Sequence, residues 1–201
     1  MSHVVISSVV EGQGEVAAVP VLLRRMAADM SPETWVEVLR PYRVSRGSLL
    51  VPYGLERVVA ALAEQGGPMA GVLVLLDADD ECPAELGPRL LERVHTARPD
   101  RPSSVVLANR EFEAWFLAAA PSLRGQRGLA QDIQAPAAAE QPRDCKGWLS
   151  RHRTDGRAYK PATDQAALTA VFDMETARKN SLSFDKLWRD VERLLREAAD
   201  P

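Results

Sequence analysis

Two stretches of the chain decide its fold: HVVISSVVEGQGE at residues 3–15 and GVLVLLDADDE at residues 71–81. Each begins with an apolar run whose length and composition are typical of a buried β-strand. Each run is followed at once by acidic residues: Glu11, Glu15, Asp77 and Asp79. In an open α/β sheet, ligands bind beyond the carboxyl ends of the strands. The sequence therefore predicts that carboxylates from two strand ends lie side by side.

Such a group of carboxylates predicts a metal site, because crowded carboxylates repel one another unless a cation neutralises them. Asp77 and Asp79 are alternate residues, so in an extended strand both would point the same way and reach one ion or an ion pair. Hard oxygen ligands suit Mg²⁺ or Mn²⁺. The predicted ligands are Glu11, Glu15, Asp77 and Asp79, with Glu111 and Glu113 as further candidates.

Each of these acids also has a simpler interpretation. Glu11 is equally placed to be an acid at the entry of a helix, where the helix dipole favours negative charge. Glu111 and Glu113 follow a later apolar run and could serve as solvated acids of a first helical turn. The sequence leaves these alternatives open.

Length and composition indicate one domain, or one domain with a small appendage, in a chain of 201 residues. The hydrophobic share of 46% is enough for a core of normal size, and the net charge is −3. No apolar stretch reaches eighteen residues, and the first residues do not have the pattern of a signal peptide. Two cysteines, Cys82 and Cys145, are too few for a disulfide framework, so we expect a cytoplasmic protein without a membrane segment.

Strand-like and helix-like segments alternate along the first part of the chain. This alternation predicts βαβ units and a mainly parallel sheet flanked by helices, a Rossmann-like α/β fold. Pro20 is expected to open the first helix after a turn at 12–19, because proline favours the first helical turn. Residues 41–53 are expected to form a loop. The expected strands are 3–10, 34–39, 71–76 and 103–109, and the expected helices after the first are 54–65, 83–97 and 110–119.

The sequence changes character after about residue 120. Residues 121–163 are rich in Ala, Pro, Gly and Arg and have no clear period, and 130–142 is expected to be a surface loop or a partly disordered insert. Two amphipathic helices are expected at 164–178 and 184–198. We therefore divide the chain into an α/β core, 1–120, and a loop-rich basic segment with C-terminal helices packed on the core, 121–201.

A local excess of basic residues lies in the second part. Residues 141–160 contain six Lys or Arg against two acids. A basic segment beside an acidic metal site could hold the phosphates of DNA or RNA, and a solvated loop is the alternative. The candidate nucleic-acid contacts are Arg143, Lys146, Arg151, Arg153 and Arg157.

Other common sites are disfavoured by the pattern of the residues. The GQG at 12–14 lacks both the GxGxxG spacing and the Lys-Ser/Thr of a Walker loop, which disfavours a nucleotide cradle. His3, His95 and His152 are isolated from one another, so no zinc spacing is present. No Ser/His/Asp set stands out.

A strand that ends in a glutamate, followed by a later strand that ends in DxD, resembles the Toprim domain. Topoisomerases, bacterial primases, recombination-associated proteins and the overcoming-lysogenization-defect (OLD) nucleases share that domain. The segments VEGQGEVAAVPVLLRRM, LLDADD and NREFEAWFLA are similar to an uncharacterised bacterial Toprim-like family, domain of unknown function 4276. The similarity covers residues 3–120 and extends to YKPATDQAAL and SLSFDKLWRDVERLL near the C-terminus.

The resemblance implies specific roles for several residues. Glu11 takes the place of the Toprim general acid/base, Asp77 and Asp79 take the place of its metal-binding aspartates, and Glu15 matches a second glutamate of the OLD-type nucleases. Glu111 or Glu113 is a looser match to a further acidic ligand. Lys160 corresponds to a basic residue that supports cleavage.

The expected function is therefore a Mg²⁺- or Mn²⁺-dependent nuclease of the Toprim class. OLD-type enzymes join an ATPase to this domain, and the chain has no Walker motif, so a separately encoded ATPase and a phage-defence or DNA-repair role are expected by analogy. The alternative is a non-catalytic Toprim-fold subunit that binds a partner protein or nucleic acid. A receiver-like domain is ranked last, because the dense aspartate cluster follows the third expected strand rather than the first.

Overall fold

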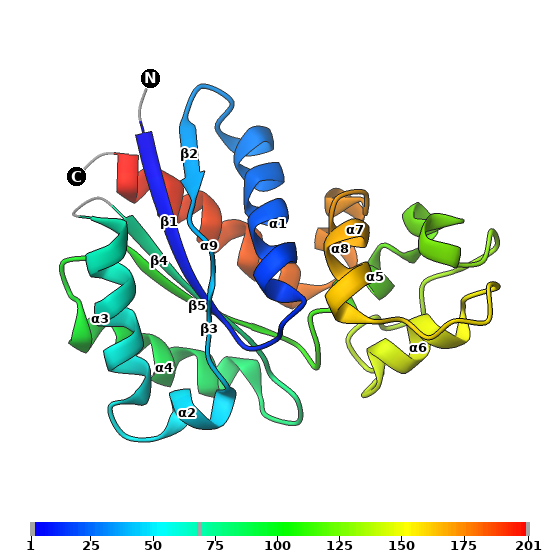
Figure 1. The fold of residues 1–201 in the computed structure, drawn as a ribbon, viewed down its shortest axis with the longest axis horizontal. Helices are drawn as coiled ribbons and strands as arrows, with labels where there is room; N and C mark the ends of the chain where they lie inside the picture. The colour runs from blue at the N-terminus through cyan, green and yellow to red at the C-terminus, as the bar shows by residue number, and fades with distance from the viewer. Residues whose placement is uncertain (1–2, 68–69, 200–201) are drawn as a thin grey trace.

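A five-stranded sheet forms the centre of the fold (Figure 1). The computed structural model describes residues 3–67 and 70–199. The strands are β1 (His3–Val10), β2 (Trp35–Val38), β3 (Tyr42–Arg43), β4 (Ala70–Asp77) and β5 (Ser103–Ala108). Their order is β2-β1-β4-β5, with β3 paired to the end of β1, and all of these pairings are parallel. The predicted fold class is confirmed, as is the adjacency of the expected strands 3–10, 71–76 and 103–108.

Alternate residues of the central strands pack into two separate hydrophobic layers. In β4, Leu73 and Leu75 belong to one layer, whereas Val74 and Leu76 belong to the other. A strand covered by helices on both faces has no solvated side, so its sequence is an almost continuous apolar run. This is why the sequence pattern located β1, β4 and β5 closely.

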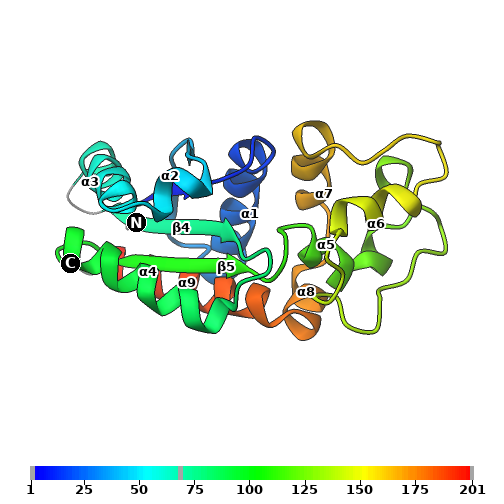
Figure 2. The same cartoon turned by 90° about the horizontal axis from the view of Figure 1, so that it is seen from below.

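Helices cover both faces of the sheet (Figures 1 and 2). One face carries α2 (Arg46–Leu50), α3 (Gly54–Gly66) and α4 (Pro83–Ala97), and the other carries α1 (Glu15–Met30) and the C-terminal helix α9 (Leu182–Ala199). With both faces covered, the carboxyl ends of β4 and β5 face the remaining part of the chain (Figure 2). No helix in the ranges 3–67 and 70–199 is long and apolar enough to cross a lipid bilayer.

Residues 114–180, which we call the lobe, lie beyond the carboxyl ends of β4 and β5 (Figure 2). The lobe contains four short helices: α5 (Ala114–Ala118), α6 (Cys145–Arg151), α7 (Ala166–Thr169) and α8 (Met174–Asn180). Two 3₁₀ turns (Ala120–Leu123 and Gln126–Gly128) and a π-helical turn (Pro161–Gln165) complete it. The segment 130–142 has no helix or strand, in agreement with the expected loop.

Buried contacts fix the lobe to the helices that flank the sheet, α1 and α9. The rings of Trp115 and Phe184 lie 5.3 Å apart, and the Trp115 indole N–H donates to Ser183 Oγ at 2.9 Å. From α1, the Arg25 guanidinium donates to the carbonyl oxygens of Thr169 at 2.7 Å and Phe172 at 2.9 Å. Aromatic packing and these hydrogen bonds give the lobe a defined position relative to the strand ends.

The first helix begins earlier than predicted. It starts at Glu15 rather than at Pro20, which lies inside α1. An interior proline removes one helical hydrogen bond and crowds the preceding turn. The helix continues because residues on both sides of Pro20 are buried in the core, among them Val19 and Leu22.

Two other expectations about local structure were wrong. Residues 41–53 are not all loop, since β3 and α2 lie within them, and the Ser45 side chain caps α2 by accepting from the Ser48 N–H. The expected helix at 164–178 is divided into the π-helical turn, α7 and α8. Asp173 starts a new helix there because its carboxylate accepts the Thr176 N–H at 2.6 Å.

Gly14 provides a test of how tightly the turn after β1 packs on the lobe. A Cβ at this position would lie 2.1 Å from Gln165 Oε1 and 2.7 Å from the Pro161 carbonyl oxygen. Because the second contact is with backbone, Gly14→Ala should lower the free energy of unfolding by about 1–3 kcal/mol. The control is Gly87→Ala in α4, where a Cβ meets nothing within 4 Å, and helix propensity should raise stability by about 1 kcal/mol. Urea denaturation measures both, and equal effects would contradict the packing.

Candidate functional site

The turn after β1 is closed by the side chain of Glu15. Its Oε2 accepts the backbone N–H groups of Glu11 at 3.1 Å and Gly12 at 3.2 Å. Glu15 is the first residue of α1 and is only 5% exposed. A carboxylate that accepts two N–H groups near a helix start is stabilised there. The glutamate therefore has a structural role in the turn, and it leaves its other oxygen, Oε1, without a hydrogen bond among the described residues.

The two glycines of this turn allow close approach rather than an unusual backbone conformation. A Cβ on Gly12 would lie 3.0 Å from Glu15 Oε1, and Gly14 packs against the π-helical turn of the lobe. Gly14 has a φ of −68°, which any residue can adopt. The GQG sequence thus lets Glu15 fold back on its own turn and lets the lobe approach β1.

Asp77 is the last residue of β4 and lies at the same end of the sheet. Strand register pairs Val9 of β1 with Val74 of β4, so Glu11 and Asp77 leave the sheet at nearly the same level. Asp77 Oδ1 accepts the Phe112 N–H at 2.8 Å. Asp77 Oδ2 has no hydrogen bond within the described ranges and lies 4.0 Å from the Lys146 ammonium.

Asp79 does not lie beside Asp77 in the way that the sequence pattern predicted. Strand β4 ends at Asp77, and Asp79 has a left-handed backbone with a φ of 53°. The expected extended geometry is therefore wrong, because the chain turns before Asp79. Its side chain is 64% exposed and lies 3.8 Å from Arg46. Asp79 remains close enough to Glu11 for its charge to raise the Glu11 pKa.

Glu111 and Glu113 face Asp77 from the chain that follows β5, and Lys146 lies between the three acids. The Lys146 ammonium lies 2.8 Å from Glu111 Oε1, 3.1 Å from Glu113 Oε2 and 4.0 Å from Asp77 Oδ2. Glu111 Oε2 also accepts the N–H groups of Cys145 and Lys146 at the start of α6. The buried Glu113 accepts the Tyr159 hydroxyl at 2.9 Å.

Five carboxyl groups, which we call the acidic group, lie close to one another around the Lys146 ammonium: those of Glu11, Glu15, Asp77, Glu111 and Glu113. Burial is the main cause of the raised pKa values of Glu11, Glu15, Asp77 and Glu113. It raises the pKa of Glu15 to about 6 against its hydrogen bonds from Gly12 and Glu11, with the charges of Glu113 and Glu11 adding to the rise. Burial and the Glu15 charge raise the Asp77 pKa well above its ordinary value. Glu11 also has a raised pKa because of burial, opposed by the Arg46 charge. The group as a whole is short of positive charge.

The donor set suits a hard divalent cation, although the side chains are not arranged around one point. No three His, Cys, Asp or Glu side chains in residues 3–67 and 70–199 stand in positions that would hold a metal ion. Glu11 Oε2, Glu15 Oε1 and Asp77 Oδ2 accept no hydrogen bond from a described residue. Glu113 Oε2 also accepts none, but it lies 3.1 Å from the Lys146 ammonium. Glu11 Oε2 is also fully buried. Buried oxygens without partners fit a cation chemically.

Comparison with known proteins identifies a family. A family model described as Domain of unknown function (DUF4276) matches residues 10–192, which is most of the chain. The chain belongs to this family. The match begins at the end of β1, includes both strand-end acidic groups and the whole lobe, and ends in α9. No curated protein and no solved structure matches the chain.

The basic residues predicted from residues 141–160 of this DUF4276 chain do not form one surface. Lys146 belongs to the acidic group, and Arg143 lies beside it with its guanidinium 3.2 Å from Asp80. Arg151 pairs with Asp144 on the exposed side of α6. Arg153, Arg157 and Lys160 line a separate pocket of the lobe. Lys160, which the resemblance assigned to cleavage, makes no ion pair with the acidic group.

Sequence reasoning missed the parts of the site that come from distant segments. Lys146 was expected to contact nucleic acid, but it lies sixty-nine residues after Asp77 and nothing in its neighbours indicates a carboxylate partner. Arg46 was placed in a loop, yet it donates to the Asp77 carbonyl oxygen and to Glu81. Tyr159 reaches Glu113 only because the lobe folds back on the strand ends.

Glu15 gives a pH-dependent test of this electrostatic arrangement. Its folded-state pKa of about 6 lies above the ordinary value of 4.5, so its contribution to stability is complete below pH 4.5 and is lost as pH rises through 6. In EDTA, Glu15→Gln should therefore be more stable than wild type by about 2 kcal/mol at pH 7.5. The difference should disappear at pH 3.5, because Glu15 is then mostly protonated in both the folded and the unfolded state.

Urea denaturation at the two pH values measures this effect, with Glu33→Gln as the control at an exposed position. The control should change stability equally at both pH values. A Glu15→Gln variant that is less stable than wild type at pH 7.5 would contradict the assignment of a destabilising buried charge.

Proposed function

We propose that the protein is a Mg²⁺- or Mn²⁺-dependent phosphodiesterase of the Toprim class that cleaves DNA or RNA. The observation that carries the proposal is the group of carboxyl groups at the ends of β1 and β4, which has more negative charge than Lys146 neutralises. The resemblance of the Glu11 and DxD segments to the Toprim domain supports the same reaction class.

Glu11, Glu15 and Asp77 are the residues proposed to hold the ion, because each has a carboxyl oxygen that accepts no hydrogen bond from the described residues. Two of these side chains are already held through their other oxygen, by backbone N–H groups. When bound, a divalent ion would supply charge stabilisation for the phosphate and lower the pKa of a water molecule. Asp79 and Glu111 are the proposed outer ligands.

The protein's own residues would bind the substrate and handle a proton. Glu11 is partly buried, and its raised pKa lets it hold and release a proton closer to neutral pH than an ordinary glutamate. Arg110 and Arg143 lie at the mouth of the site, where both contact the exposed Asp80. Their guanidinium groups are suited to hold phosphate oxygens next to the carboxyl groups.

The cellular role follows from the resemblance to OLD-type nucleases. Those enzymes combine an ATPase with a Toprim domain, and this chain has no Walker motif. We therefore propose that a separately encoded ATPase works with it, in a phage-defence or DNA-repair system.

A second candidate function is a non-catalytic subunit that binds a partner or nucleic acid. The specific observation in its favour is that Lys146 already bonds Glu111 and Glu113 and approaches Asp77. In addition, no three acids in the described part of the chain stand in positions that would hold a metal ion. A tethered ammonium could serve as a permanent counterion, and the acidic group would then stabilise the fold without chemistry. Metal binding and cleavage separate the two functions.

Metal binding is tested by titrating the protein with Mn²⁺ in a calorimeter. Wild type should bind, and Asp77→Asn should lose the heat signal, because the variant keeps the oxygen that accepts the Phe112 N–H but lacks the charge. Asp132→Asn, at an exposed site in the lobe, is the matched control and should bind like wild type. Binding that is unchanged in Asp77→Asn would contradict the site.

Cleavage is tested by nicking of supercoiled plasmid and of a labelled RNA with Mn²⁺, with and without any co-encoded ATPase. Glu11→Gln should reduce cutting by a factor of about 10² or more, because removing a catalytic acid or base typically has an effect of this size. Asp77→Asn should abolish cutting, and Lys160→Ala should only reduce it. Glu33→Gln is the matched control and should cut at the wild-type rate. If wild type and Glu11→Gln give equal background cutting in every setting, the subunit function replaces the nuclease.

A further inference from the structure

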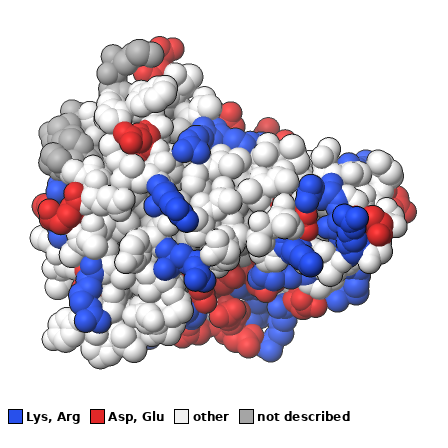
Figure 3. Space-filling view, viewed as in Figure 1, with Lys and Arg blue, Asp and Glu red and all other residues white. Residues whose placement is uncertain are grey.

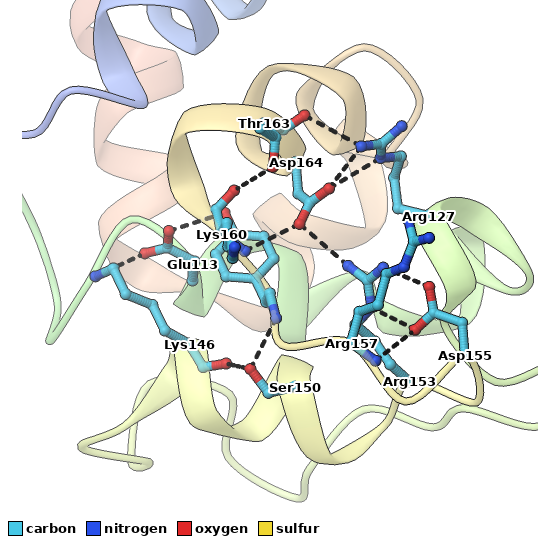
Figure 4. A network of polar contacts seen from close by, with 11 residues as sticks. Glu113, Arg127, Lys146, Ser150, Arg153, Asp155, Arg157, Lys160, Thr163 and Asp164 are labelled. Carbon is cyan, nitrogen blue, oxygen red and sulfur yellow. Dashed lines mark hydrogen bonds and ion pairs between the residues drawn. The ribbon is translucent and has the colours of Figure 1, made fainter.

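The lobe contains a basic pocket that is separate from the acidic group. Its volume is about 530 Å³, and Figure 4 shows most of its lining residues. The lining residues are Arg127, Arg153, Arg157, Ala158, Lys160, Thr163 and Asp164. Figure 3 shows Lys and Arg side chains gathered over the lobe. Four of the seven lining residues are basic, so the pocket carries an excess of positive charge.

One side of the pocket is a fixed network around the buried Asp164. Its Oδ1 accepts from Arg127 Nη2 at 2.8 Å, and its Oδ2 accepts from Arg153 Nη1 at 3.1 Å and from the Lys160 N–H at 2.9 Å. These hydrogen bonds outweigh the opposing effect of burial and lower the Asp164 pKa. Arg153 is 7% exposed and also pairs with Asp155 at 2.6 Å. Two arginines are thus held rigidly by two acids.

Two further basic side chains in the pocket have no such partner. Arg157 and Lys160 are exposed, and within the described residues neither side chain makes a hydrogen bond or an ion pair. Four basic residues and two acids leave the pocket and its rim with a net charge of +2. A concave surface with unpaired positive charge and a rigid wall is suited to an anion.

The pocket is connected to the acidic group by the segment that carries Lys160. The neighbouring residue, Tyr159, is buried and donates its hydroxyl to Glu113, while its N–H donates to Ser150 Oγ. Ser150 Oγ in turn donates to the Lys146 carbonyl oxygen. Figure 4 shows Lys160 between Glu113 on one side and Asp164 on the other. Consecutive residues therefore contact the acidic group and the basic pocket.

We propose that the basic pocket binds one backbone phosphate of a nucleic-acid strand. Another phosphodiester of the same strand would then lie at the acidic group. This inference rests on the proposed function, because it names the strand cleaved there as the ligand. Guanidinium and ammonium donors match the charge and geometry of a phosphate. Arg157 and Lys160 are the residues that contact it, and Arg127 and Arg153 keep the wall in place.

The experiment measures binding of a fluorescein-labelled single-stranded DNA 20-mer by anisotropy, in EDTA, over a series of KCl concentrations. Each lost phosphate contact reduces the slope of log K against log[salt] by about 0.7 for a single strand. The Arg157→Gln/Lys160→Gln variant loses the one phosphate assigned to the pocket, so its slope should be less steep than that of wild type by about 0.7. Its affinity at 0.1 M KCl should fall on the order of tenfold.

The matched control is Arg57→Gln/Arg196→Gln, which removes the same charge from exposed positions of α3 and α9. Both α3 and the end of α9 lie at the opposite end of the molecule from the lobe (Figure 1). The control should keep the wild-type slope. Among the described residues, neither Arg157 nor Lys160 makes a side-chain hydrogen bond or ion pair that the substitution removes. The lobe variant, like the control, should therefore show a thermal midpoint close to that of wild type. A slope that changes equally in the two variants, or a wild type that does not bind the 20-mer, overturns the proposal.

A free phosphate is the other source of the same chemistry, and calorimetry with inorganic phosphate tests it. Heat that disappears in Arg157→Gln/Lys160→Gln, together with an unchanged oligonucleotide slope, would assign the pocket to free phosphate and overturn the assignment to a strand. Because binding is measured without metal, the result is independent of cleavage. If the protein does not cut nucleic acid but the slope of log K against log[salt] still depends on Arg157 and Lys160, the nuclease function is refuted. The phosphate-binding role of the pocket is then still supported.

Discussion

Carboxyl groups crowd together at the ends of the parallel strands, and their mutual repulsion has to be offset by the chain around them. A parallel sheet brings the ends of β1, β4 and the chain after β5 to one edge, and each of them carries an acid. Backbone N–H groups donate to Glu15 and Asp77, and the Lys146 ammonium pairs with Glu113. These contacts reduce the repulsion among the carboxyl groups. The raised pKa values of Glu15 and Asp77 indicate that this compensation is incomplete.

The lobe is the part of the chain that makes the compensation possible. It carries Lys146 and Tyr159 to the strand ends, and it is held there by the aromatic rings around Trp115 and by Arg25 from α1. The residue after Tyr159, Lys160, lines the basic pocket of the lobe. The fold therefore places the acidic group and the basic pocket near each other. The chain between Tyr159 and Asp164 sets the distance between them.

The sequence predicted the features that depend on local pattern. Continuous apolar runs identified β1, β4 and β5, and the position of Asp77 directly after such a run placed it at the strand end. Features that depend on tertiary contact could not be predicted. Asp79 leaves the strand direction because the backbone at that residue is left-handed, and the start of α1 depends on Glu15 closing the preceding turn. The role of Lys146 depends on how the lobe folds, which no periodicity encodes.

If the acidic group takes a cation, as proposed, Lys146 would compete with it for the carboxyl oxygens. An ammonium tethered by the fold competes at a high effective concentration, because its approach to Glu111 and Glu113 is intramolecular. A monovalent ion from solution offers the same charge and has no tether, so it has no advantage over the lysine. A divalent ion offers twice the charge and can displace the ammonium from its partners. The lysine would therefore act as a threshold, and the acidic group would exchange its internal cation only for one of higher charge density.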